Sequence, residues 1–147
     1  MNNIKTLNNH ELNRVSKNVV IAKFKEYGCQ FIENERTLSI KSPDGRFIEI
    51  IVKSIRWPTE YVLILKKHMN PEQRNLYVSL VLYLEGTKPD LYLIPAEAFL
   101  NPNDLLRDRP NYKEPEFGMN VSNKNMPLLL PYKLENFFKN QKGTELI

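Results

Sequence analysis

One stretch of β-forming residues, 76–84, constrains the fold more than any other part of the sequence. Every second residue from Leu76 to Leu84 is aliphatic. The residues between them are mostly apolar as well: Tyr77, Ser79, Val81 and Tyr83. A strand that is apolar on both faces needs cover on both faces, so the run predicts a central strand of a layered domain. Its nine residues are about half of what a membrane span requires.

The flanking sequence predicts helices at both ends and further strands between them. An amphipathic helix is expected to begin at Asn8 or Asn9 and to end at Gly28. The expected strands are 29–33, 37–41, 46–53, 61–65, 76–84, 89–94 and an edge strand at 117–121. A short helix is expected at 95–100, and a closing helix is expected to begin at Pro131 and to end at Gly143.

Two connections between strands follow from local sequence, and one long segment is read as a surface loop. The turn at 43–45, with the sequence Pro-Asp-Gly, predicts a hairpin between strands 37–41 and 46–53. The polar stretch 68–72 suits a hairpin connection between strands 61–65 and 76–84. Segment 101–116 holds three prolines among charges and is expected to be a loop. These elements predict an α+β or mixed α/β fold with a single central mixed sheet, flanked by an N-terminal and a C-terminal helix.

Length and composition predict one cytoplasmic domain. A chain of 147 residues suits a single core, which we place at 9–142, with a flexible N-terminus at 1–8 and a tail at 143–147. The first ten residues lack the apolar stretch of a signal peptide, and the single cysteine, Cys29, fits a reducing compartment as a small buried filler. No membrane partner is expected. The net charge of +4 is compatible with nucleic acid without requiring it.

Several chemistries lack the residues that they need. Five glycines, none grouped, exclude a Walker phosphate loop and a dinucleotide fingerprint. Two histidines and one cysteine without clustering make a structural zinc site improbable. No metal ligands are assigned, and no cofactor is expected.

Three separate segments together suggest a family. They are the helix end Glu26-Tyr27-Gly28, the strand 48–54 that contains Val52-Lys53-Ser54, and the segment 91–97. With these segments the chain resembles a compact restriction-endonuclease-like protein of the PD-(D/E)XK superfamily, over roughly 15–138. The resemblance implies a helix before a hairpin whose second strand carries an acid, any residue and then lysine. It also makes Phe117-Gly118-Met119 look like the aromatic strand that closes many small members.

The catalytic acids that the resemblance implies are missing. Nucleases of this kind hold Mg²⁺ with two carboxylates, while the lysine stabilises charge or positions the attacking water. Lys53 matches the lysine, but Ile51 stands at the acid position two residues earlier. No acid occurs between Glu35 and Asp44, where the earlier aspartate belongs. Glu49 shares a face with Lys53, yet four strand residues separate the two backbones by about 13 Å, against about 7 Å for the family spacing.

Lys53, Arg56 and Trp57 remain the candidate nucleic-acid-binding residues, with Lys53 and, more weakly, Glu49 as candidate catalytic residues. Each has a structural alternative. The stem of Lys53 would pack on the sheet while its ammonium reaches water. Trp57 would either stack a base beside Arg56 or plug the end of the strand. The short basic runs 66–68 and 107–109 are expected to be solvated loops.

Three functions stay open at this point. The first is a catalytically silent nuclease-fold protein that binds nucleic acid or a protein partner, in the bacterial defence or mobile-element setting that the resemblance implies. The second is a Mg²⁺-dependent nuclease with relocated acids that uses Lys53. The third is an interaction or immunity-type module without nucleic-acid binding. The sequence does not indicate an oligomeric state.

Overall fold

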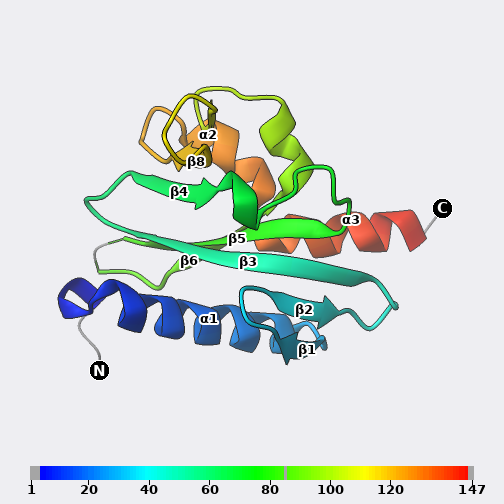
Figure 1. The fold of residues 1–147 in the computed structure, drawn as a ribbon. Coiled ribbons are helices and arrows are strands. Elements are labelled where there is room, and N and C mark those ends of the chain that lie inside the picture. The colour runs from blue at the N-terminus through cyan, green and yellow to red at the C-terminus, as the bar shows by residue number, and fades with distance from the viewer. Residues whose placement is uncertain (1–3, 85, 146–147) are drawn as a thin grey trace.

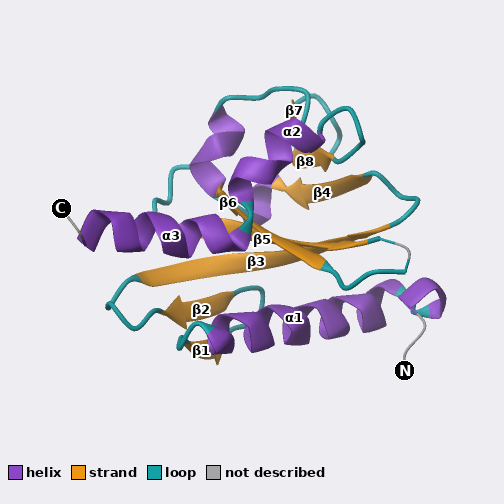
Figure 2. Ribbon diagram, turned by 180° about the vertical axis from the view of Figure 1, so that it is seen from behind, coloured by secondary structure: helices purple, strands orange, loops and turns teal. Residues whose placement is uncertain are grey.

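The computed structural model describes residues 4–84 and 86–145, which form two sheets with helices around them (Figures 1 and 2). Residues 1–3 and 146–147, part of the expected flexible start and tail, lie outside the described residues. The helices are η1 (Ile4–Thr6), α1 (Asn9–Glu26), η2 (Lys66–His68), η3 (Ala96–Leu100), α2 (Met126–Leu129), η4 (Leu130–Tyr132) and α3 (Leu134–Glu145). The strands are β1 (Gln30–Glu33), β2 (Leu38–Lys41), β3 (Phe47–Arg56), β4 (Tyr61–Leu65), β5 (Leu76–Tyr83), β6 (Asp90–Pro95), β7 (Leu106–Arg109) and β8 (Glu116–Asn120).

Helix α1 begins and ends where the sequence predicts. Asn8 is its N-cap: the Asn8 side chain accepts a hydrogen bond from the Glu11 backbone N–H at 2.8 Å, and the Glu11 carboxylate accepts one from the Asn8 N–H at 3.1 Å. This reciprocal pair satisfies two amide groups that a helix start leaves without partners. Gly28 follows the helix with φ of +81°, a conformation that favours glycine.

The larger sheet is mixed and has the order β1-β2-β3-β5-β6. β2 and β3 form the predicted antiparallel hairpin, and β3 then pairs in parallel with β5, from Glu49 opposite Leu76 to Arg56 opposite Tyr83. β5 is central and buried along its length, as its sequence predicts. The predicted fold class, a central mixed sheet flanked by an N-terminal and a C-terminal helix, is confirmed.

Strand alternation divides the core into two clusters on opposite faces of this sheet. One cluster, which includes Ile48 and Ile50 of β3, packs against α1 and α3. The other, which includes Ile51 and Ile55, packs against the smaller sheet and α2. Figure 1 shows these layers, with α1 below the large sheet and β4, β8 and α2 above it. Each β3 side chain therefore belongs to the helical face or to the small-sheet face.

The smaller sheet, β4-β8-β7, corrects three sequence predictions, and the closing helix corrects a fourth. β4 pairs with β8 rather than forming a hairpin with β5. Strand 117–121 is the centre of this sheet, not an edge strand, and it does not close the larger sheet. β7 lies inside the expected loop 101–116. The closing helix begins as two short turns and runs past Gly143 to Glu145 as α3.

A buried hydrogen bond ties α1 to the central strand. The Ser16 and Tyr83 hydroxyl groups lie 2.9 Å apart, and both residues are buried. We expect Tyr83→Phe to lower the free energy of unfolding by about 1 kcal/mol, because it leaves the Ser16 hydroxyl without this partner. Urea denaturation measures the effect. Tyr83→Phe combined with Ser16→Ala is expected to cost less than Tyr83→Phe alone, and an equal or greater cost for the pair would contradict this assignment.

Candidate nucleic-acid interface

Lys53 lies in the middle of β3, on the face turned toward the smaller sheet. Ile51 and Ile55, the residues two before and two after it, belong to the core of that face. Lys53 is half-buried, and loss of hydration lowers the pKa of its ammonium group. No charged neighbour contributes resolvably to this shift, and among the described residues Lys53 makes no ion pair. An ammonium group in this position is suited to receive an anion.

Arg36, Lys53 and Lys67 all lie within electrostatic range of His68. His68, at the end of η2, is exposed, and the pKa of its imidazole is lowered first by partial loss of hydration and then by Arg36, Lys67 and Lys53. Arg36 comes from the turn between β1 and β2, and Lys67 from η2. We call Arg36, Lys53, Lys67 and His68 the basic cluster. The acid near it, Glu114, already pairs with Lys67 at 3.4 Å.

The chain does not gather the acids that a magnesium site needs. Glu49 lies on the Lys53 face, and the residue paired with it across β2 and β3 is Ser39. The Ser39 hydroxyl accepts a hydrogen bond from the Asn34 amide at 2.8 Å. Within residues 4–84 and 86–145, no three His, Cys, Asp or Glu side chains are grouped so that they could hold a metal ion. One carboxylate beside a hydroxyl does not fit the two-carboxylate ligand set, so we derive no step through Mg²⁺.

Arg56 and Trp57 lie at the far end of β3 and do not join the basic cluster. Arg56 points to the helical face, where its Nη1 donates hydrogen bonds to the carbonyl oxygens of Ile4, at 2.7 Å, and of Leu7. Trp57 is 43% exposed, so it does not plug the strand end. It lines a pocket of about 430 Å³ together with Lys5, Arg56, Pro58 and Thr59. The predicted binding residues therefore occupy two places on β3.

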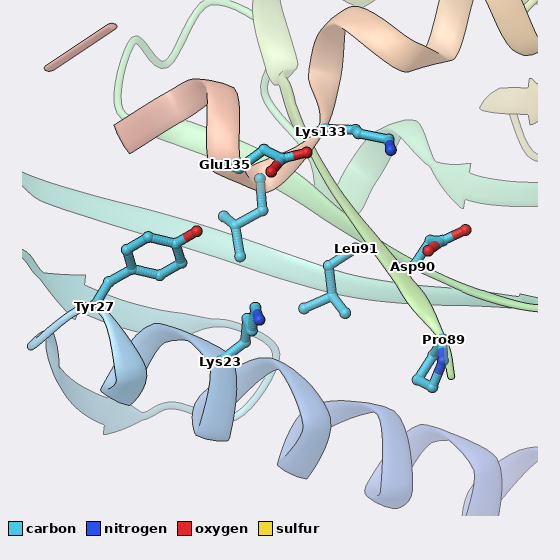
Figure 3. A pocket seen from close by; sticks show the side chains of 8 residues that line it. Lys23, Tyr27, Pro89, Asp90, Leu91, Lys133 and Glu135 are labelled. Carbon is cyan, nitrogen blue, oxygen red and sulfur yellow. The ribbon is translucent and has the colours of Figure 1, made fainter. Parts of the chain in front are cut away.

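A different pocket, of about 210 Å³, lies on the helical face of the sheet (Figure 3). Lys23 of α1 and Tyr27, just after that helix, face Glu135 of α3 and Lys133, just before it, with Asp90 of β6 on another side. Two lysines and two carboxylates line the pocket, so its charges balance. The basic cluster, in contrast, has more basic than acidic side chains.

Sequence reasoning found Lys53 but missed Arg36, Lys67 and His68. Arg36 lies in the turn between β1 and β2, whereas Lys67 and His68 are adjacent in η2, and the fold brings these two distant segments within electrostatic range of each other. The basic run 66–68, which was expected to be a solvated loop, is the sequence feature that could have indicated Lys67 and His68. Within that run Lys66 binds Asp108 and lies over the Phe117 ring, whereas Lys67 and His68 are exposed beside Lys53.

Comparison with known proteins finds a solved structure with a similar fold and no similar sequence. No protein-family model matches the sequence, and no curated protein matches it. Among solved structures, the chain is similar to Hjc, a Holliday junction resolvase from Archaeoglobus fulgidus, with 9% identity and a TM-score of 0.48. The alignment covers 80% of this chain and 88% of Hjc. In the described part of the chain, no helix is long and apolar enough to span a membrane.

Proposed function

We propose that this chain binds nucleic acid through the basic cluster and does not cleave it by the two-carboxylate mechanism. The proposal is supported by Arg36, Lys53 and Lys67 lying within electrostatic range of His68, where the one acid with a resolved effect on His68, Glu114, pairs with Lys67. Phosphate contacts from Lys and Arg supply most of the affinity in nonspecific nucleic-acid binding. The resemblance to restriction-endonuclease-like proteins agrees with this ligand class.

Cleavage by this mechanism is not expected, because the side chains at the expected acid positions are not carboxylates. The Ile51 side chain offers no oxygen, and of Leu38 and Ser39, near which the earlier aspartate is expected, only Ser39 has a side-chain oxygen, a hydroxyl bonded to Asn34. Glu49 alone cannot supply the paired carboxylates of a magnesium nuclease. The residues that remain favour holding a phosphate backbone over attacking it.

The test combines binding and cleavage in one set of samples. Fluorescent single-stranded and double-stranded DNA and RNA are incubated with the pure protein in low salt, with and without Mg²⁺ or Mn²⁺. We expect binding of at least one form, weakened about tenfold in Lys53→Gln, and intact oligonucleotides. Lys139→Gln, an exposed lysine on α3, serves as the matched control. Metal-dependent cleavage that disappears in Lys53→Gln would contradict the claim that the protein does not cleave nucleic acid. Absence of binding would contradict the proposal that it binds nucleic acid.

His68 gives the binding a dependence on pH. Its pKa is lowered by loss of hydration and by Arg36, Lys67 and Lys53, so the imidazole is mostly neutral at pH 7. Protonation adds a positive charge to the cluster, so affinity for an oligonucleotide should rise as the pH falls below about 6.5. His68→Asn is expected to lose this increase, whereas His10→Asn, on the exposed start of α1, keeps it. Fluorescence anisotropy between pH 5 and 8 measures both, and an unchanged profile in His68→Asn would exclude this role.

A further inference from the structure

Half of β3 has a backbone edge that no strand in the described part of the chain covers. β2 pairs with β3 up to Leu38 opposite Ile50, whereas β5 pairs with the other edge as far as Arg56. Figure 1 shows β2 beside one end of β3 only. Residues 51–56, the free edge, therefore extend for about 20 Å with a partner on one side. Edges of this kind are templates for a further strand.

The direction of the backbone groups follows from the hydrogen bonds at the ends of β3. The Glu49 N–H donates to Asn75 O at 2.8 Å, and the Trp57 N–H donates to Tyr83 O at 2.9 Å, both on the β5 side. Because alternate residues of a strand direct their N–H and C=O groups to opposite edges, Val52 and Ser54 direct theirs to the free edge. Among the described residues, neither makes a turn or loop hydrogen bond there.

A pocket lies at each end of the free edge, and both pockets are basic. The pocket at the β2 end, of about 160 Å³, is lined by Lys17 and Arg36 with Asn13, Thr37, Leu38, Ile50 and Val52. The pocket at the other end has Lys5 and Arg56 beside the exposed Trp57. Along the strand Lys53 lies between the two pockets, with its side chain on the opposite face of the sheet, and no acid is among the described residues that line either pocket. Main-chain groups flanked by side-chain pockets are the arrangement that recognises an extended peptide.

We infer that the free edge binds an extended acidic peptide of another protein, which pairs with Val52 and Ser54 as an added strand. Glutamate or aspartate side chains complement the lysines and arginines along the edge. A second copy of this chain is a poorer occupant, because pairing two such edges brings like charges together. A bound peptide contacts Arg36 in the pocket at the β2 end, so it competes with nucleic acid for that residue of the basic cluster. This competition rests on the proposed function, whereas the strand pairing does not.

The pairing is tested without nucleic acid. A pool of ten-residue peptides, with glutamate at every second position and the others randomised, is selected on the immobilised protein. We expect enriched peptides whose binding slows hydrogen exchange of the Val52 and Ser54 amides, which exchange fast in the free protein. N-methylation of the peptide amides that face β3 is expected to weaken binding about tenfold, and N-methylation of the intervening amides less. No enrichment, or equal effects of the two methylation patterns, would overturn the inference.

Two further experiments distinguish a peptide from other molecules at the free edge, and distinguish failure of this inference from failure of the proposed function. Ser54→Pro removes one edge N–H and should weaken the peptide, while Ser54→Thr retains binding, with circular dichroism verifying both folds. Protection of Val52 and Ser54 by an oligonucleotide alone, or by raised protein concentration alone, would assign the edge to nucleic acid or to a dimer and overturn the inference. Peptide binding without oligonucleotide binding would refute the proposed function and leave the strand pairing standing.

Discussion

Gly118→Ala is expected to lower the free energy of unfolding by about 3 kcal/mol, because Tyr61 occupies the space that a Cβ atom needs. A Cβ at Gly118 would lie 1.8 Å from the Tyr61 Oη and 2.3 Å from its Cζ. Two contacts hold the Tyr61 ring in this position: its hydroxyl donates to Glu116 at 3.1 Å, and the Arg109 guanidinium lies 4.4 Å from its centroid. Burial and the bond to Glu116 raise the pKa of Tyr61 to about 12.

A double-mutant cycle separates this clash from any other effect of the added methyl group. Gly118→Ala introduced into Tyr61→Ala should cost little, because the ring that it meets is gone. Urea denaturation of the wild type, both single variants and the pair gives the coupling free energy. The same cost for Gly118→Ala in both backgrounds would show that Tyr61 does not lie across Gly118. The small sheet, which carries η2 beside Lys53, would then need a different explanation of its packing.

Arg36→Gln combined with Lys53→Gln is expected to weaken oligonucleotide binding about 100-fold at 0.1 M salt. Each phosphate contact contributes about one unit to the dependence of log K on log salt, which makes each lost contact worth about tenfold at that salt concentration. Arg36 is exposed, and Lys53 is half-buried and makes no ion pair with any residue that the structure describes, so both side chains are available to a phosphate. Anisotropy titrations measure the change.

The control for this pair is a double variant that removes the same charge elsewhere. Lys23→Gln with Lys133→Gln alters the charge-balanced pocket on the helical face. We expect it to change affinity less than threefold, since distant charges are screened at this salt concentration. If both pairs weaken binding equally, net charge and not the basic cluster governs the affinity.

Local patterns predicted the larger sheet because its strands carry their own signals. The alternation of 46–53 placed Ile48 and Ile50 on one face and Ile51 and Lys53 on the other, as the structure has them. The smaller sheet was missed because its pairing is long-range. β4 and β8 are separated by 50 residues, and β7 contains one apolar residue, Leu106, among charges. When its partner strand β8 is not known, the β7 segment has the composition of a loop.

The candidate site was predictable only where it lies on a strand. Lys53 was found from its position on β3, and the missing acids follow from Ile51 and Ser39 in the sequence. The positions of Arg36 and His68 depend on how the β1–β2 turn and η2 come to lie near β3, which no local pattern specifies. For the same reason the free edge was invisible, since it depends on β2 ending before β3 does.

The salt dependence of oligonucleotide binding tests the central claim most directly. If the basic cluster holds the phosphate backbone, a plot of log K against log salt should be linear with a slope of about −3, and Arg36→Gln with Lys53→Gln should reduce its magnitude by about two. The wild type and this variant are titrated in parallel from about 25 to about 300 mM salt, a range wide enough to measure such slopes. A slope near zero, or the same slope in both proteins, would contradict the claim that this cluster binds nucleic acid.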